Sequence, residues 1–253
     1  MKIKLLSLFL ILTLPSLGQH AGMHSYTIDL TQVIDDRVKV SVDARSLQLT
    51  TKQRTYNFHF PATIPGTYAT LDYGRFIQDF QAYGSDGALL KVKRKDNTFT
   101  IYGKPERLEY WADDTFDAQI RKNKVFEPAG TNNQERTNFL LNAAGYFGFF
   151  EGQEDLPVSL EITKSPSLFG LSAMESYSYG NTQNFYARNY HEFLDCPVMV
   201  SRPDTTSFQL GGAKVTIGVF TENGRELSEE IYAQVATSMK AIEAFLEGDL
   251  PVD

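Results

Sequence analysis

Cysteine is almost absent from this 253-residue chain. Cys196 is the only one, so no disulfide can form within the chain and its stability must come from packing. Its neighbours in the run Leu194-Asp195-Cys196-Pro197-Val198 are largely apolar, and the sequence shows no obvious histidine partner for it. This setting favours a buried small side chain over a reactive nucleophile.

Positive charge is also scarce. The chain has 24 Lys and Arg against 31 Asp and Glu, a formal net charge of −7. A protein that binds a phosphate backbone needs a basic surface to replace counterions. The composition therefore argues against a nucleic-acid partner.

Histidine is too sparse to form an obvious zinc site. The zinc-binding pattern His-Glu-x-x-His places two imidazoles one helical turn apart. His191-Glu192 begins such a pattern, but Asp195 occupies the second histidine position, and Pro197 argues against a helix there. We expect no metal site, and we interpret His20, His24 and His59 as solvated or hydrogen-bonded side chains.

Familiar catalytic motifs are missing as well. The chain contains neither a Gly-x-Ser-x-Gly nucleophile turn nor a phosphate-binding glycine loop. Neighbouring carboxylates occur in turns, in a polar stretch or at the start of a helix, where solvation and capping explain them. The sequence thus predicts no catalytic residue, no bound cofactor and no metal ligand in this chain.

A long hydrophobic run occurs only near the N-terminus. Residues Leu5–Leu14 are apolar, but a bilayer helix needs about 20 such residues. Two lysines precede the run, and Ser16 and Gly18 follow it at the positions typical of a cleavage site. We predict a signal peptide over residues 1–18, and hence an exported protein, periplasmic or extracellular, with no membrane contact after cleavage.

Short alternating segments separated by turn residues dominate the chain as far as about residue 220. They predict a mainly β fold, an antiparallel sandwich or saddle. The connections Asp35–Arg37, Ser85–Gly87 and Asp96-Asn97 read as hairpin turns. The strands that we expect lie at residues 26–30, 38–42, 56–60, 76–83, 89–92, 99–102, 158–162, 208–210 and 214–220.

Two stretches interrupt this pattern. Residues Thr137–Phe150 are apolar and contain glycines, without a clean period, which predicts an irregular or strand-like buried segment. Residues Asp113–Arg136 are polar and highly charged, which predicts a long excursion over the surface.

The end of the chain has a helical pattern. Its apolar residues recur at spacings of three and four and predict an amphipathic helix over Glu229–Glu247. Ser228 is the expected N-cap and Gly248 the expected terminator. The apolar stripe must be covered by another element; it consists of Leu227, Ile231, Val235, Met239, Ile242 and Leu246.

Aromatic residues suggest a second possibility, a site for carbohydrate. A Ser-, Gly- and Asn-rich stretch carries aromatic rings that could stack on sugars: Tyr177, Tyr179, Phe185 and Tyr186. Phenylalanines that fill a core and tyrosines at its edge explain the same composition, and we favour that interpretation.

The run Ile64-Pro65-Gly66-Thr67-Tyr68 is the most informative feature of the chain. Pro65 fixes its own φ and Gly66 adopts positive φ easily, so the chain should turn sharply here. The segment Asp72-Tyr73-Gly74-Arg75 follows closely. A turn beside an aspartate and an arginine is compatible with a site, or with hydrogen bonds that fix the turn.

These runs and later ones resemble the N-terminal domain of the M61 metallopeptidases, the glycyl aminopeptidase group. Thr67 and Cys196 stand where the family usually has serine. The blocks that carry the resemblance, in family order, are Ile64–Tyr68, Leu71–Arg75, Phe80–Ala82, Phe139–Ala143, Asn189–Val198 and Phe245–Pro251.

The resemblance implies a three-part enzyme: a β domain, a thermolysin-like zinc domain and usually a PDZ module. It implies that residues 19–222 form the β domain and that residues 223–253 lead into a truncated catalytic domain, the partner in cis. Zinc and a peptide substrate belong to a full-length member, so we expect this chain alone to be inactive. Candidate contacts with the cleft or the next domain are Tyr68, Asp72, Tyr73, Arg75, Tyr190 and Asp195.

The alternative is an independent secreted β-sandwich that binds a ligand, for instance carbohydrate. The terminal helix distinguishes the two hypotheses. Burial of its apolar stripe against the β domain favours an independent module, whereas an exposed or loosely packed stripe favours a truncated enzyme.

Overall fold

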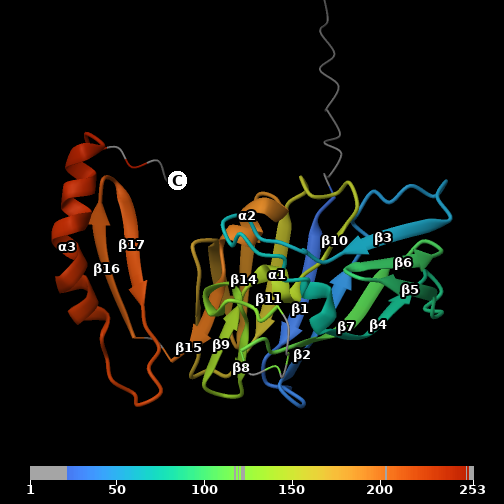
Figure 1. The fold of residues 1–253 in the computed structure, drawn as a ribbon, viewed down its shortest axis with the longest axis horizontal. Helices are drawn as coiled ribbons and strands as arrows, with labels where there is room; N and C mark the ends of the chain where they lie inside the picture. The colour runs from blue at the N-terminus through green and yellow to red at the C-terminus, as the bar shows by residue number, and fades with distance from the viewer. Residues whose placement is uncertain are drawn as a thin grey trace, which may run out of the picture.

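The protein is a layered β structure with a separate hairpin and helix at one end. A computed structural model describes residues 22–116, 118, 120, 123–202, 204–248 and 250. The expected signal peptide and His20 lie outside the described residues. Figure 1 shows three sheets gathered in one body, with the C-terminal helix at the far left. The mainly β class predicted from the sequence is confirmed.

The largest sheet has seven strands in the order β13-β14-β11-β1-β2-β7-β4. β1 runs parallel to β11, and the other neighbouring strands are antiparallel. Inward residues alternate with polar outward residues, as in any sheet with one face on a core. The strands are β1 (His24–Asp29), β2 (Arg37–Asp43), β4 (Ile77–Tyr83), β7 (Arg107–Asp113), β11 (Val158–Thr163), β13 (Glu175–Tyr179) and β14 (Thr182–Ala187).

Two four-stranded sheets lie against the large one. The first has the order β10-β3-β6-β5 and comprises β3 (Thr55–His59), β5 (Lys91–Lys95), β6 (Thr98–Tyr102) and β10 (Phe149–Phe150). The second has the order β12-β15-β9-β8 and comprises β8 (Asn132–Gln134), β9 (Asn138–Leu141), β12 (Phe169–Leu171) and β15 (Val198–Ser201). Residues from all three sheets share one hydrophobic core.

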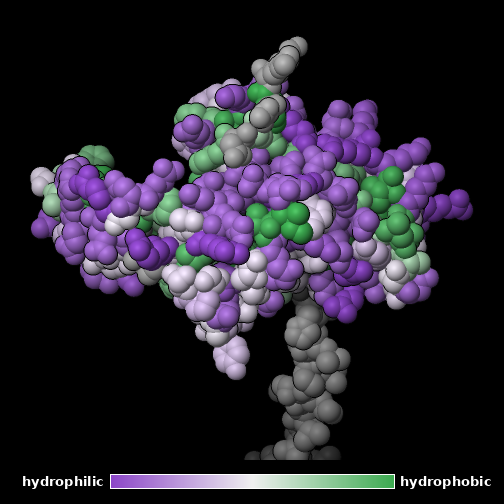
Figure 2. Space-filling model, turned by 90° about the horizontal axis from the view of Figure 1, so that it is seen from below, coloured by the Kyte–Doolittle hydropathy of each residue, from purple (hydrophilic) through white to green (hydrophobic). Residues whose placement is uncertain are grey.

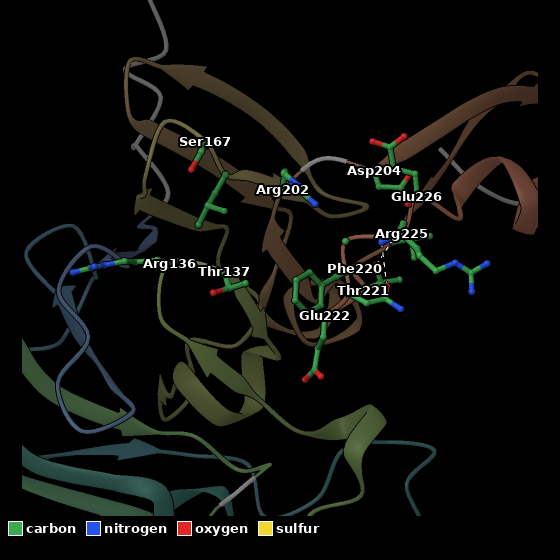
Figure 3. A pocket seen from close by; sticks show the side chains of 14 residues that line it. Arg136, Thr137, Ser167, Arg202, Asp204, Phe220, Thr221, Glu222, Arg225 and Glu226 are labelled. Carbon is green, nitrogen blue, oxygen red and sulfur yellow. Dashed lines mark hydrogen bonds between the residues drawn. The ribbon is translucent and has the colours of Figure 1, made fainter.

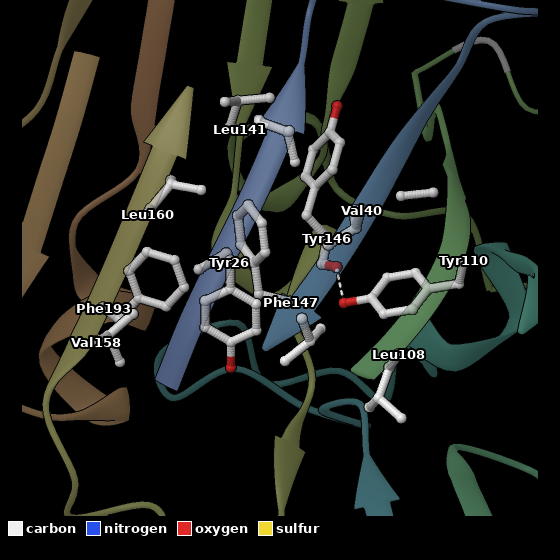
Figure 4. Close-up of a cluster of buried hydrophobic side chains, with 14 of the residues drawn as sticks. Tyr26, Val40, Leu108, Tyr110, Leu141, Tyr146, Phe147, Val158, Leu160 and Phe193 are labelled. Atoms are coloured by element: carbon white, nitrogen blue, oxygen red, sulfur yellow. Dashed lines mark hydrogen bonds between the residues drawn. The ribbon is translucent and has the colours of Figure 1, made fainter. Parts of the chain in front are cut away.

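Aromatic side chains fill much of this core (Figure 4). Three buried tyrosine hydroxyls donate to three successive backbone carbonyls of one segment that crosses the core. Tyr110 donates to the carbonyl of Tyr146 at 2.8 Å, Tyr190 to that of Phe147, and Tyr26 to that of Gly148 at 2.6 Å. A buried carbonyl without a partner is costly, so these hydroxyls stabilise a segment that lies outside the regular strands.

That segment belongs to the stretch that we expected to be irregular and buried. It contains β9, a single helical turn α1 (Ala143–Tyr146) and the short strand β10, and most of its side chains are buried. Both features of the prediction are present. Four successive residues, from Ala143 to Tyr146, are all buried. For this reason the sequence shows neither the two-residue period of a strand nor the 3.6-residue period of a helix.

Two other expectations need correction. The stretch Asp113–Arg136 is only partly a surface excursion. The stretch contributes the short helix η2 (Glu127–Ala129) and the strand β8. Asp114 and Thr131 are buried, and the Asp114 carboxylate accepts a hydrogen bond from the backbone of Asn133 in β8. The turn at Ser85–Gly87 does not close a regular hairpin. Tyr83 at the end of β4 forms one isolated antiparallel bridge with Leu89, and β5 begins only at Lys91, in a different sheet.

A short helix, α2 (Tyr190–Asp195), lies where we expected none. The side chain of Asn189 caps it by accepting a hydrogen bond from the Glu192 backbone at 2.9 Å. Pro197 comes just beyond its end, a position where proline stops a helix without preventing it. In the described part of the chain, no helix has the length and apolar character needed to cross a membrane.

The C-terminal unit consists of β16 (Thr205–Leu210), β17 (Ala213–Gly218) and α3 (Ser228–Phe245). The predicted terminal helix is confirmed, and Gly248 follows it at φ 86°, donating to the carbonyl of Glu243 at 2.8 Å. The expected N-cap is wrong, because Ser228 is already helical. Asp204 acts in its place: its carboxylate accepts hydrogen bonds from the backbones of Leu227 and Ser228.

The helix α3 packs on the hairpin, and the ring of Tyr232, beside the apolar stripe, lies 4.7 Å from the ring of Phe208. The stripe is nevertheless only half-buried. Ile242 is 48% exposed, and Phe245 at the end of the helix is 85% exposed. The domain boundary expected between residues 222 and 223 falls inside this unit, between its hairpin and its helix.

Candidate functional site

The Pro-Gly-Thr-Tyr loop makes the sharp turn that its sequence predicts. The backbone and the hydroxyl of Thr67 both donate to the carbonyl of Ile64, at 3.2 and 2.8 Å. Gly66 has φ 87°, and Tyr68 has φ 51°, a left-handed conformation that few residues with a side chain adopt. The side chain of Tyr68 is 99% exposed. The loop therefore presents one aromatic ring to the solvent.

Asn97 fixes the segment that follows this loop. Its Oδ1 accepts a hydrogen bond from the backbone of Gly74 at 2.9 Å, and its Nδ2 donates to Asp72 at 2.8 Å. The sequence analysis recognised Asn97 only as a turn residue. No local signal marks its second role, because its partners are more than twenty residues away in the chain.

Two arginines hold the same region through backbone carbonyls. The guanidinium of Arg94 donates to Gly74, Ile77 and Asp96 at 2.6, 3.1 and 3.2 Å. The guanidinium of Arg75 donates to the carbonyl of Asn123 and lies 4.9 Å from the ring centre of Phe76. Both cations thus stabilise the turn that surrounds η1 (Tyr73–Phe76).

These groups border an open recess of about 750 Å³, lined by Asp72, Arg75, Arg94, Asp96 and Asn97. We call it the η1 recess. It brings together Asp72 and Arg75, two of the six residues predicted from the sequence. Carboxylates, guanidinium groups and an amide meet here, so the recess can hydrogen-bond to a polar segment of a ligand or of a neighbouring domain.

Tyr73 lies beneath the recess and is fully buried. Its hydroxyl donates to the carbonyl of Ala129 at 2.5 Å, and burial raises the pKa of that hydroxyl. The ring belongs to a small second core with Ile64, Leu71, Phe76, Ala129 and Ala144. Tyr73 therefore anchors the loop from inside and is not available to a ligand in this conformation.

Tyr190 and Asp195 lie apart from the η1 recess, at opposite ends of α2. Tyr190 is buried, and burial raises the pKa of its hydroxyl. Asp195 is exposed. Burial raises the pKa of the Cys196 thiol, and the charges of Glu192 and Asp195 raise it further, which suits an unreactive cysteine. The structure does not assemble the six candidates into one site.

A second cleft lies between the β body and the C-terminal unit (Figure 3). It has a volume of about 450 Å³, and its charged lining residues include Arg136, Arg202, Glu222, Arg225 and Glu226. We call it the junction cleft. Sequence reasoning missed it because its walls are separate loops that carry no motif.

The histidines do not form a zinc site. His24, His59 and His191 lie on β1, β3 and α2, and no three His, Cys, Asp or Glu residues in the described part of the chain gather as metal ligands. His24 is buried against the carbonyl of Gln153 at 2.8 Å, and His59 lies 3.0 Å from the hydroxyl of Thr98. This donor set does not fit zinc.

The aromatic stretch is divided between core and surface. Phe185 is buried. The rings of Tyr177 and Tyr186 stack at 5.8 Å with their hydroxyls 3.1 Å apart, and Tyr179 is exposed. Figure 2 shows one face of the molecule, on which hydrophobic residues form separate patches among hydrophilic ones.

A solved structure shares this fold. An aminopeptidase N family protein from Idiomarina loihiensis has 20% sequence identity and a TM-score of 0.73, over 90% of this chain and 37% of its own. An M1 zinc metallopeptidase from Deinococcus radiodurans, bound to a Tyr-Ser-Ala substrate, has 9% identity and a TM-score of 0.44, over 92% of this chain and 54% of its own. The second likeness is too distant to define a common fold.

This chain spans well under two thirds of either protein's length. A comparison with curated protein sequences finds no match. The model of the peptidase M61 N-terminal domain family matches residues 25–202, which cover the three sheets of the β body and stop just before β16. The chain therefore belongs to the peptidase M61 N-terminal domain family.

Proposed function

We propose that this chain is the N-terminal part of an exported zinc aminopeptidase of the M61 type. In this proposal the β body is a non-catalytic domain that packs on a catalytic domain and forms one wall of the substrate cleft. The hairpin and helix at residues 204–248 lead into that catalytic domain. The observation that carries the proposal is the family match over residues 25–202, which stops where the hairpin begins.

The half-buried stripe of α3 supports this assignment. A helix that packs on a two-stranded hairpin has only one covered side, and isolated hairpins are marginally stable in water. Ile242 and Phe245 remain exposed. Exposed apolar side chains of this kind are expected where the proposed catalytic domain would pack on the unit. An independent carbohydrate-binding module would instead bury this stripe on its own β body.

Tyr68 and the η1 recess are the contacts that we assign to the cleft or to the next domain. Tyr68 presents its whole ring on a loop that internal hydrogen bonds hold in shape. Strained backbone at a rigid, exposed position is a common feature of ligand-contacting loops. Tyr73 supports this surface from the small core beneath it.

In this proposal the catalytic chemistry belongs to the catalytic domain and not to the β body. A peptide with a free N-terminus would be the substrate, and zinc would be bound by a His-Glu-x-x-His motif of the catalytic domain. The β body supplies shape and polar contacts.

The first test is to sequence the gene downstream of the codon for Asp253. An in-frame His-Glu-x-x-His motif within the next domain supports the proposal, and a stop codon with no peptidase reading frame contradicts it. Purified 253-residue chain should show no hydrolysis of aminoacyl p-nitroanilides. Stoichiometric zinc with turnover in that chain would overturn the assignment.

A second test addresses the cleft. In an extended, active protein, Tyr68→Ala should raise KM for a peptide substrate without unfolding the β body. Tyr179→Ala is the matched control, because Tyr179 is another largely exposed tyrosine, on a strand at the edge of the large sheet. Equal changes in KM for the two substitutions would contradict the assignment of Tyr68 to the substrate cleft.

A further inference from the structure

Three lysines form a straight row on the edge strand β5. Lys91, Lys93 and Lys95 occupy alternate positions, so their side chains leave the same face of the sheet about 7 Å apart. Their partners on β6 are Tyr102, Thr100 and Thr98, whereas the intervening Phe99 and Ile101 are buried. The lysine row therefore lies on the outer, solvent-facing side of this sheet.

The row lacks the carboxylate partners that cations have on the large sheet. There, Lys39 pairs with Glu109 at 2.9 Å, and Arg37 pairs with Asp113 at 3.7 Å, in both cases between β2 and β7. Across the described residues, no carboxylate oxygen lies within 4 Å of the three lysine ammonium groups. Opposite charges on neighbouring strands stabilise each other. The three lysines make no such ion pair with the residues that the structure describes, so their charges are available to an external anion.

Tyr102 holds two of these ammonium groups in place. Lys91 Nζ and Lys93 Nζ lie 5.5 and 5.9 Å from the centre of its ring, within the range of cation–π attraction. The hydroxyls of Thr98 and Thr100 continue the surface beside the row. Lysine side chains that are already oriented lose less conformational entropy when an anion binds.

We propose that the lysine row binds an extended acidic polypeptide. Carboxylates at alternate positions of an extended chain repeat at about 7 Å, the same interval as the lysines. The whole protein carries a net charge of −7, so long-range electrostatics oppose an acidic partner and the attraction must be local. Figure 1 shows β5 at the end of the molecule opposite α3.

Lysines on an edge strand also prevent unwanted pairing with other strands. That protective role requires no ligand and no particular spacing of charge on a partner. A test of spacing therefore separates the two roles. The proposal concerns binding alone, so it can fail without affecting the assignment of the chain to an aminopeptidase.

The probe is a fluorescein-labelled peptide of alternating Glu and Thr, measured by fluorescence anisotropy at low salt and at about 0.15 M salt, where exposed charges are partly screened. A peptide of the same composition, with all Glu in one block, tests the spacing. The triple variant Lys91→Gln, Lys93→Gln, Lys95→Gln removes the row. The variant Lys124→Gln, Lys214→Gln, Lys240→Gln makes the same change in net charge at exposed positions elsewhere.

We expect the alternating peptide to bind more tightly than the blocked peptide and the row variant to bind about tenfold more weakly, with the control variant close to the wild type. Replacement of the three lysines by arginine should retain binding. Equal losses in the two Gln variants, no preference for the alternating peptide, or no binding at low salt would overturn the proposal. Row-dependent binding of dextran sulfate without binding of the peptide would overturn it too, in favour of an anionic polysaccharide.

Discussion

The backbone of Gly74 lies against the backbone of Asn97 so closely that a Cβ atom on Gly74 would stand 2.7 Å from the Asn97 Cα. The same residues share a hydrogen bond from Gly74 N to Asn97 Oδ1 at 2.9 Å. The short helix η1 and the β5–β6 turn are therefore in direct backbone contact. Only glycine fits at this position.

Gly74→Ala should lower the free energy of unfolding by about 1–3 kcal/mol, because the added methyl group forces the two backbones apart. Chemical denaturation of the 253-residue chain measures this change. Gly84→Ala is the control, because the nearest atom to its added Cβ is a flexible side-chain oxygen of Asp86 at 3.3 Å. An unchanged unfolding midpoint for Gly74→Ala would contradict the described contact.

The buried tyrosines allow a second prediction. Tyr190→Phe leaves the carbonyl of Phe147 without its donor, and Tyr26→Phe does the same to Gly148. Each substitution should cost about 1–3 kcal/mol of unfolding free energy, the penalty for an unsatisfied buried polar group. Tyr83→Phe removes an exposed hydroxyl from Gln81 and should cost less than about 0.5 kcal/mol. Similar values for all three variants would show that the carbonyls find other partners.

His24 makes stability depend on pH. Burial lowers its pKa from the usual 6.5, while the Gln153 carbonyl and the charge of Glu154 act in the opposite direction. Its Nδ1 is buried without a hydrogen-bond partner, so the neutral ring is favoured in the folded state. The unfolded chain binds the proton more readily, and stability that is present above pH 6.5 should be lost as the pH falls through the folded pKa.

The measurement is the free energy of unfolding at several pH values for the wild type and for His24→Gln, which keeps a donor but cannot titrate. The difference between the two proteins should change most on acidification below pH 6.5, the usual histidine pKa. A constant difference across this range would show that His24 does not titrate on unfolding.

Asp204 should control the start of α3. Hydrogen bonds from the Leu227 and Ser228 backbones lower the pKa of its carboxyl. The capping contribution is therefore complete above the ordinary aspartate pKa of 3.8 and is lost as the pH falls through the lowered folded value. Asp204→Ala should accelerate hydrogen exchange at the first amides of α3. Asp195→Ala, which removes an exposed carboxylate at the end of α2, should leave those amides unchanged.

Sequence periodicity predicted the strands of the first hundred residues well, because they alternate between core and solvent. It also predicted α3, whose stripe has a clean helical spacing. It missed some fully buried or very short elements, and it also missed β7, which alternates between core and solvent, and β13, which is exposed throughout. The helix α2 was missed because Pro197 was given too much weight. The parallel pairing of β1 with β11 could not be predicted from local patterns, because it connects residues more than a hundred positions apart.

The candidate site was predicted less completely than the fold. The turn chemistry of Pro65 and Gly66 pointed to the correct loop, and Asp72 and Arg75 share the η1 recess. The other side of that recess is Arg94 and Asn97, which only the tertiary structure brings close. Tyr73 and Tyr190 looked like candidate contacts in the sequence, where burial is invisible, and the fold places both of them in the interior.

The C-terminal unit meets the β body through a small contact in which the backbone of Gly218 lies beside Leu171 and Met199. Around it, α3 and its hairpin leave their apolar side chains half-covered, in contrast to the closed core of the sheets. Two neighbouring regions with such different burial need not melt together. The half-covered C-terminal unit can therefore open locally while the closed core of the three sheets remains folded.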